Sequence, residues 1–131
     1  MTNYILLNII LTKTKVVIII ANVKRIIVND KDPIEEFINT LEPKDAAKVL
    51  DRLELLDEVG LKLGPPYIKK LQNYNLYEYR VQYRRNQYRI LFFTYENLII
   101  LVHGFQYKDK IPKKEIEIAV VRKEDFLKEL E

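Results

Sequence analysis

Basic residues that could bind phosphate groups are concentrated in one stretch of this sequence. Between Pro65 and Ile90 the chain has six bases and a single acid, Glu78; the bases are Lys69, Lys70, Arg80, Arg84, Arg85 and Arg89. The stretch from Asp30 to Leu63 has the opposite bias, with ten acids and five bases. Because phosphate binding depends on local cation density more than on the net charge of +3, the basic stretch indicates a polyanion as partner. The alternative is a solvated strand face.

Composition argues against several other kinds of site. The chain has no cysteine, which excludes disulfides, thiolate metal sites and cysteine nucleophiles and suits a cytoplasmic protein. His103 is the single histidine, so neither a histidine-rich metal site nor a Ser-His-Asp arrangement is plausible. No acidic cluster for magnesium lies beside the basic stretch, and three glycines are too few for a glycine-rich phosphate loop. We therefore expect no metal and no organic cofactor.

Cleavage of RNA is a reaction that the remaining residue types can perform. The RNA supplies its own nucleophile, the 2′-hydroxyl. The protein has to orient that hydroxyl, assist its deprotonation, and stabilise the charge that develops on the phosphate. Lysine, arginine and tyrosine side chains can share these tasks.

Residues 23–131 are predicted to form one domain of the α+β class. We expect an N-terminal strand, two helices, a three-stranded antiparallel meander and a C-terminal helix, with the helices on one face of the sheet. The expected strands are residues 23–28, 76–83, 88–95 and 98–106, and the expected helices are 33–41, 44–59 and 112–130. Asp32, Pro33 and Glu35 signal the start of the first helix, and Gly60 signals the end of the second.

Residues 1–22 form an apolar extension with two runs around Thr12-Lys13-Thr14-Lys15. Lys13 and Lys15 fall where a membrane helix would have its centre, and the pattern of a signal peptide is not convincing. We expect two extra strands joined by a turn, and no membrane role. Alternatively, the natural protein starts after this stretch.

An assumed strand register brings the basic residues together. If residues 84–87 form a loop and Glu96-Asn97 a two-residue turn, Arg89 lies opposite both Gln82 and Gly104. Arg80, Gln82 and Arg89 then share an open face, beside a glycine that leaves room for a phosphate. The chain continues from there into Tyr107, Lys108, Lys110, Lys113 and Lys114. In this arrangement Arg89→Ala should abolish cleavage and spare the fold. Arg80 could instead simply pair with Glu78, and His103 is interpreted as a core histidine on the face of Ile90 and Leu101.

Five segments in consistent order resemble the phage-type HigB branch of the RelE/ParE toxin superfamily. They are Gly64-Pro65-Pro66-x-x-Lys69-Lys70-Leu71, Leu76-Tyr77-Glu78-Tyr79-Arg80-Val81, Tyr88-Arg89-Ile90-Leu91-Phe92-Phe93, His103-Gly104-Phe105 and Pro112-Lys113-Lys114-Glu115-Ile116. The resemblance covers about residues 24–130. It implies a RelE-like fold and a type II toxin that arrests growth as a metal-independent mRNA endonuclease acting in the ribosome. The implied partners are the ribosome with its mRNA and a cognate antitoxin, often a helix-turn-helix protein like HigA.

The resemblance also implies roles for individual residues. Arg80 and Arg89 match its catalytic arginines, and Lys108 and Lys110 match its basic segment after the last strand, where Asp109 dilutes the charge. RNA contacts are expected from Lys69, Lys70, Gln82, Arg84, Arg85, Tyr107 and Lys113. Two alternatives stay open: a ParE-like poison of DNA gyrase, and an inactive module that binds an antitoxin.

Overall fold

The computed structural model describes residues 22–107 and 109–131. Along the chain lie β1 (Val23–Arg25), α2 (Pro33–Asn39), α3 (Pro43–Val59), the 3-10 helix η1 (Gly60–Leu63), β2 (Ile68–Leu71), the 3-10 helix η2 (Gln72–Tyr74), β3 (Leu76–Tyr83), β4 (Asn86–Tyr95), β5 (Leu98–Gln106) and α4 (Lys113–Glu129). The predicted α+β fold is confirmed, and the predicted elements occur in the expected order, with β2 and the two 3-10 helices in addition. The expectation of extra strands in residues 1–21 lies outside the described residues.

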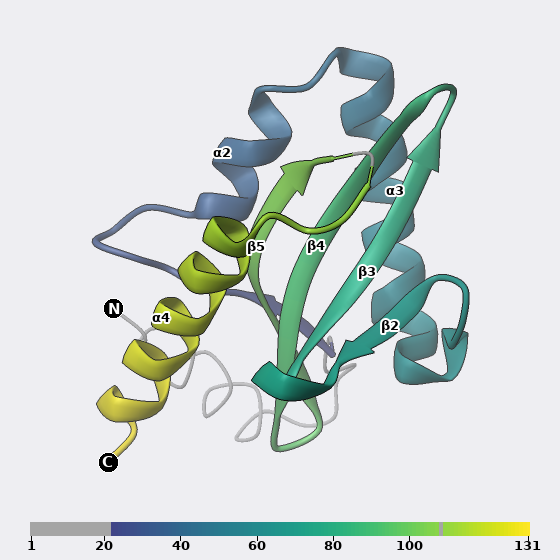
Figure 1. Ribbon diagram of the computed structural model, residues 1–131. Helices are drawn as coiled ribbons and strands as arrows, with labels where there is room; N and C mark the ends of the chain where they lie inside the picture. The colour runs from purple at the N-terminus through teal and green to yellow at the C-terminus, as the bar shows by residue number, and fades with distance from the viewer. Residues whose placement is uncertain (1–21, 108) are drawn as a thin grey trace, which may run out of the picture.

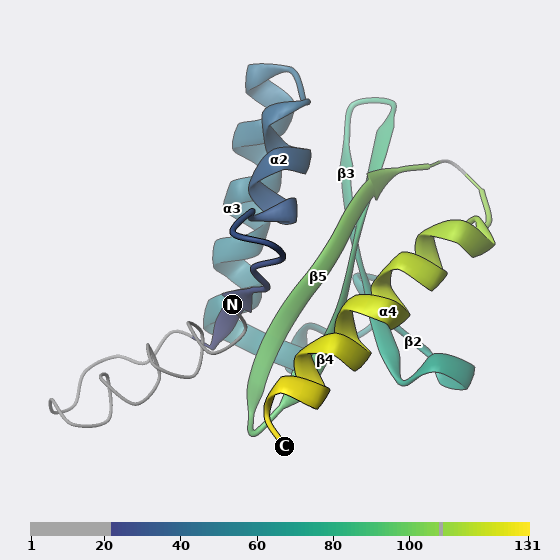
Figure 2. The same ribbon diagram turned by 90° about the vertical axis from the view of Figure 1, so that its left-hand side faces the viewer.

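A five-stranded sheet in the order β1-β5-β4-β3-β2 forms the middle layer (Figure 1). β1 runs parallel to β5, and the other pairs are antiparallel. Helices α2 and α3 cover one face and α4 covers the other (Figure 2). The expectation that all helices share one face is therefore wrong. The last helix lies on the other face because the chain leaves β5 at the end of the sheet that carries the β3–β4 turn, called the hairpin end below, and returns along the uncovered face. No helix in residues 22–107 and 109–131 combines the length and apolar character needed to span a bilayer.

Local signals in the sequence placed most helix ends correctly. Asp32 caps α2, since its Oδ1 accepts a hydrogen bond of 3.1 Å from the amide of Glu35, and Pro33 begins the helix. Gly60 ends α3 with φ +71°, a conformation that costs glycine little. β2 was not predicted, because two of its four residues are exposed lysines on an edge strand.

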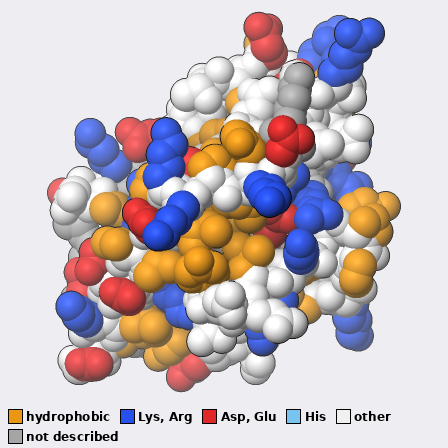
Figure 3. All heavy atoms as spheres, in the orientation of Figure 1, with side chains coloured by type: hydrophobic (Ala, Val, Ile, Leu, Met, Phe, Trp, Pro, Cys, Tyr) orange, Lys and Arg blue, Asp and Glu red, His pale blue; other side chains and the backbone are white. Residues whose placement is uncertain are grey.

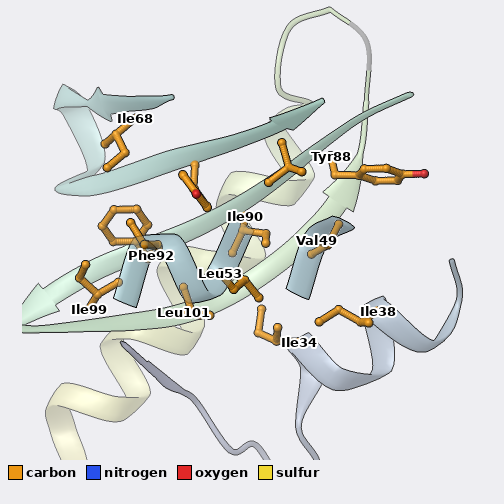
Figure 4. Packing of buried hydrophobic residues seen from close by; sticks show 13 residues of the cluster. Ile34, Ile38, Val49, Leu53, Ile68, Tyr88, Ile90, Phe92, Ile99 and Leu101 are labelled. Atoms are coloured by element: carbon orange, nitrogen blue, oxygen red, sulfur yellow. The ribbon is translucent and has the colours of Figure 1, made fainter. Parts of the chain in front are cut away.

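Two apolar clusters fill the spaces on either side of the sheet. In the first, Ile34, Ile38, Val49 and Leu53 of the two N-terminal helices pack on Ile90 and its sheet neighbours (Figure 4). The second cluster joins Phe126 and Ala119 of α4 to the opposite side of the sheet, including Leu91, Phe93 and Val102. Both faces of β4 are therefore buried, and the residues in the middle of this strand have little exposure.

The strand register differs from the expected one at two places. Tyr83 pairs with Asn86 across a turn of two residues, Arg84 and Arg85, so Arg80 lies opposite Arg89. Arg84 adopts φ +59°, which is unusual outside glycine and asparagine and gives no sequence signal of a tight turn. The β4–β5 pairing begins at Tyr95 and Leu98 as expected.

A bulge between Leu91 and Phe92 shifts the rest of the β4–β5 ladder by one residue. Gly104 therefore pairs with Ile90 and faces α2, where a Cβ would lie 2.5 Å from Cδ2 of Phe37. The expectation that Gly104 opens room for a phosphate is wrong: its missing side chain makes room for the Phe37 ring.

The bulge also turns His103 to the α4 side of the sheet, away from its expected face. His103 pairs with Leu91, and its ring joins two residues of α4. Nε2 lies 3.0 Å from Oε1 of Glu115, and Nδ1 lies 3.1 Å from Nη1 of Arg122. Arg122 also donates to the backbone oxygen of Val102 at 2.8 Å. These contacts fasten α4 to the bulge in β5.

This arrangement predicts a pH-dependent stability. Burial lowers the pKa of His103, against the opposing effect of the Glu115 hydrogen bond. The unfolded chain therefore binds the proton more readily, and the free energy of unfolding should fall as the pH drops below about 6.5. Urea unfolding at a series of pH values between about 7.5 and 5 measures this, and His103→Asn should show a flatter profile. Equal pH dependence in the two proteins would contradict the role of His103.

Candidate functional site

A basic hollow of about 380 Å³ lies beside the C-terminal half of β3. β2 pairs with β3 only as far as Ile68 and Tyr79, and a bond of 2.8 Å from the Arg80 amide to the Tyr67 oxygen closes that pairing. Ten residues line the hollow: Lys48, Arg52, Pro66, Tyr67, Arg80, Val81, Gln82, Gln87, Tyr88 and Arg89. Four of them are basic and none is acidic, so the lining favours an anionic ligand.

Helix α3 contributes Lys48 and Arg52 to this lining. Its first turn is fixed by Asp45, which is almost fully buried and accepts hydrogen bonds from the Tyr88 hydroxyl and from Nδ2 of Asn86. The bond from Tyr88 lowers the pKa of Asp45, while burial and this bond raise the pKa of Tyr88 to about 12. Lys48 and Arg52 follow Asp45 by three and seven residues and therefore lie along the same side of the helix.

Tyr67 and Arg52 contact each other in the lining of the hollow. The Arg52 guanidinium carbon lies 5.3 Å from the centre of the Tyr67 ring, within range of a cation–π contact. The Tyr79 hydroxyl donates a bond of 2.6 Å to the backbone oxygen of Arg52, which fastens the helix to the sheet. Tyr67 is 43 % exposed, so its ring remains accessible to a ligand.

The two arginines of the sheet share one buried carboxylate. Glu78 is 1 % exposed, and its two oxygens bind Nε of Arg80 at 2.6 Å and Nη1 of Arg89 at 2.8 Å. Nη2 of Arg89 also donates to Gln87 at 3.3 Å, while Nε of Arg89 is buried with no acceptor among the described residues. Arg80 is 41 % exposed and Arg89 only 9 %. Arg80 is therefore the better placed of the two to contact a ligand.

These positions correct the expected geometry of Arg89. Arg80, Gln82 and Arg89 do come together at one hollow, as expected. Arg89 nevertheless does not reach an open face beside Gly104: it is buried in an ion pair, because the shorter turn places it opposite Arg80 and close to Glu78. The alternative that Arg80 pairs with Glu78 is also realised.

The other predicted site residues lie around the hollow without lining it. Arg84 and Arg85 form the exposed turn of the β3–β4 hairpin, and the amide of Tyr107 donates to the Gln87 oxygen at 3.3 Å. Lys110 and Lys113 are exposed on the segment between β5 and α4, at the hairpin end of the sheet. Lys69 and Lys70 are exposed on β2. Lys108 lies outside the described residues.

Basic side chains on the face with α4 gather toward the hairpin end, above an apolar area in the centre of the view (Figure 3). Among residues 22–107 and 109–131, no group of three or more His, Asp or Glu side chains is arranged to hold a metal ion. The site is thus a basic and aromatic hollow whose described lining offers donors and stacking surfaces.

Sequence reasoning missed Lys48, Arg52 and Tyr67. The spacing of Asp45, Lys48 and Arg52 places them on one helix side, next to the apolar stripe that contains Val49 and Leu53. That spacing could have indicated a basic helix side, but the excess of acids between residues 30 and 63 drew attention away from the two bases. Tyr67 directly follows the Gly64-Pro65-Pro66 turn, and no pattern marks it.

The fold and the hollow define an α+β protein with a basic site suited to a polyanion. The profile of the family described as phage-derived protein Gp49-like (DUF891) matches residues 36–124. The chain therefore belongs to this family, which is associated with the toxins of toxin–antitoxin systems. No curated protein and no solved structure matches the chain.

Proposed function

We propose that this protein is the toxin of a type II toxin–antitoxin system and that it cleaves mRNA in the ribosome. The observation that carries the proposal is the hollow, whose described lining includes four basic residues and the exposed Tyr67 and no acidic residue. Membership of the Gp49-like family supports the toxin class. The proposal includes a cognate antitoxin of the helix-turn-helix type as the inhibiting partner.

The chemistry follows from the positions of the basic groups. The scissile phosphate binds next to the terminal nitrogens of Arg80, which stabilise the charge on the phosphorane formed when the 2′-hydroxyl attacks. Lys48 and Arg52, on the α3 side of the hollow, bind the RNA backbone next to the scissile phosphate. A neighbouring base stacks on Tyr67. The hydroxyl of Tyr67 and the amine of Lys48 are the candidates for proton transfer in the hollow.

The exposed basic residues around the hollow extend this binding surface. We assign contacts with the backbone of mRNA or ribosomal RNA to the hairpin turn and to the segment after β5. These residues are Arg84, Arg85, Tyr107, Lys108, Lys110 and Lys113, with Lys69 and Lys70 on the other side. Arg84 stacks on Tyr83, with 5.1 Å between its guanidinium carbon and the ring centre, so the hairpin turn offers an ordered cation.

Induced expression of the full chain in a bacterium tests the proposal. Growth should stop unless the antitoxin is co-expressed, and primer extension should show cuts in translated mRNAs in phase with the reading frame. Arrest with intact mRNA and accumulating DNA breaks would instead indicate a gyrase poison. Normal growth with high levels of folded protein would indicate an inactive, antitoxin-binding module.

Lys48→Ala should reduce RNA affinity through a single phosphate contact. Loss of one such contact lowers the salt slope of single-strand binding, log K against log salt, by about 0.7. Anisotropy titrations of a labelled RNA oligonucleotide at several salt concentrations measure the slope. Lys44→Ala, an exposed lysine one turn earlier in α3 that does not line the hollow, is the matched control. Equal slopes for Lys48→Ala and wild type would remove Lys48 from the site.

A further inference from the structure

We propose that Glu78 is a positioning residue, which holds Arg80 so that its terminal nitrogens face the substrate phosphate. This inference rests on the proposed function and extends it to a residue that does not touch the RNA. Glu78 is the single acid within the basic stretch from Pro65 to Ile90, and its carboxylate is almost fully buried between two arginines.

Strand pairing explains why a carboxylate is needed at this place. The amide of Arg80 donates to Tyr67 on the β2 side, so Arg80 and Arg89 form a non-hydrogen-bonded pair across β3 and β4. Side chains of such pairs are the closest in a sheet, with Cα atoms about 4.5 Å apart. Like charges directly opposite each other are destabilising. Glu78 binds both guanidinium groups and thereby allows the two cations to lie side by side.

The nitrogen of Arg80 that Glu78 binds indicates that Glu78 does more than neutralise the charge of the arginines. Glu78 contacts Arg80 through Nε, the nitrogen nearest the chain, at 2.6 Å. The two terminal nitrogens of Arg80 remain for a phosphate, and the side chain is 41 % exposed along the hollow. An arginine held at Nε has lost much of its rotational freedom before the ligand arrives, which is the condition for stabilising a transition state without reorganisation.

Stability alone gives a weak reason for this buried network. Replacing buried ion pairs with apolar side chains is often neutral or stabilising, because desolvation of the charges offsets their attraction. Two arginines and a glutamate at the edge of a basic hollow therefore fit a functional requirement better than a structural one.

Glu78→Gln tests the proposal in the full chain. The amide oxygen of glutamine can accept from one arginine only, and its NH₂ group faces the other. We expect the single-turnover cleavage rate on programmed ribosomes to fall about 10- to 100-fold, by analogy with the loss of outer-shell groups that orient metal ligands. RNA affinity should change much less than the rate.

The double variant Glu78→Gln/Arg80→Ala separates positioning from a structural effect. If Glu78 acts through Arg80, the double variant should cleave at the rate of Arg80→Ala alone, because the two losses are not additive. Additive losses, or full activity in Glu78→Gln, would overturn the proposal.

A wild type that binds RNA without cleaving it would overturn the proposed function alone. The same double-mutant comparison, made on RNA affinity, would then decide on Glu78. A wild type that neither binds nor cleaves RNA would overturn both.

A measurement on the wild-type protein covers the case in which Glu78→Gln does not fold. In nitrogen-15 spectra, the Arg80 Nε–H signal should be sharp and protected from exchange. Addition of a 2′-O-methyl RNA oligonucleotide, which has no free 2′-hydroxyl and cannot be cleaved, should shift the terminal guanidinium signals of Arg80 and leave the Nε–H signal protected. Loss of that protection on RNA binding would show that Glu78 releases Arg80, which contradicts positioning.

Discussion

Arg80→Ala is expected to lower the rate of mRNA cleavage about 10²- to 10³-fold, the usual effect of removing one preorganised donor to a developing oxyanion. The side chain of Arg80 is the more exposed of the two arginines that β3 and β4 contribute to the hollow. The fold should persist, because the side chain is 41 % exposed and Glu78 keeps its contact with Arg89. Single-turnover cleavage on programmed ribosomes, together with thermal unfolding, measures both effects.

Arg85→Ala is the matched control for this variant. Arg85 is an exposed arginine on the hairpin turn, five residues from Arg80 and outside the lining of the hollow. Its loss should weaken association with the RNA, most strongly at low salt, and leave the chemical step largely unchanged. Equal rate losses in the two variants would mean that general positive charge, and not the placement of Arg80, drives cleavage.

Arg89→Ala is expected to destabilise the protein, in contrast to the expectation from sequence that it would spare the fold. Removing one member of a buried ion pair leaves the other charge poorly compensated and costs about 3 kcal/mol or more. For a chain of this size that lowers the melting temperature by roughly 10 °C. The side chain of Arg89 is only 9 % exposed, and that of Glu78 is 1 % exposed. Urea unfolding and calorimetry measure the loss.

Replacing both Glu78 and Arg89 shows whether the loss of stability comes from the buried charge that is left without a partner. Arg89→Met should be destabilised like Arg89→Ala, whereas Glu78→Met/Arg89→Met should recover much of the stability because no buried charge is left without a partner. The double variant should still cleave slowly, since Arg80 has lost the group that holds it. Unchanged stability in Arg89→Ala would show that Arg89 is not buried in the ion pair described above.

The elements of the fold were predictable because local rules determine them. The Asp32 cap, the Pro33 start and the Gly60 stop each leave a mark in the sequence. The bounds of β3 also follow from alternating residues between turn signals, and those of β5 from a continuous apolar run after the Glu96-Asn97 turn. β2 was not predictable in this way, because a short edge strand with two exposed lysines has no apolar alternation.

The register could not be derived in the same way. A tight turn of two arginines lacks the Gly or Asn that usually marks such turns, and the bulge opposite Leu91 has no sequence pattern. The two differences moved Arg89 from an open face into an ion pair and turned Gly104 toward Phe37. The shared location of Arg80 and Gln82 was still predicted, because alternation along one strand is independent of register.

The α3 part of the site depends on tertiary packing. Lys48 and Arg52 lie 28 residues or more before Arg80 in the sequence. They reach the hollow because Asp45 binds Tyr88 and Asn86 and because the Tyr79 hydroxyl binds Arg52. No spacing rule connects a helix side to a particular strand edge, so these residues become candidates only when the packing is known.

The central claim is that mRNA is cleaved in the hollow by attack of the RNA's own 2′-hydroxyl. The chemical groups on the ends of the product fragments test this claim most directly. Purified protein is added to ribosomes programmed with a labelled mRNA, and the ends of the fragments are analysed. We predict a 2′,3′-cyclic phosphate on one fragment and a 5′-hydroxyl on the other, and no cleavage where the nucleotide before the cut is 2′-deoxy. Intact mRNA, or fragments with 3′-hydroxyl and 5′-phosphate ends from both the ribose and the deoxy substrate, would contradict the account.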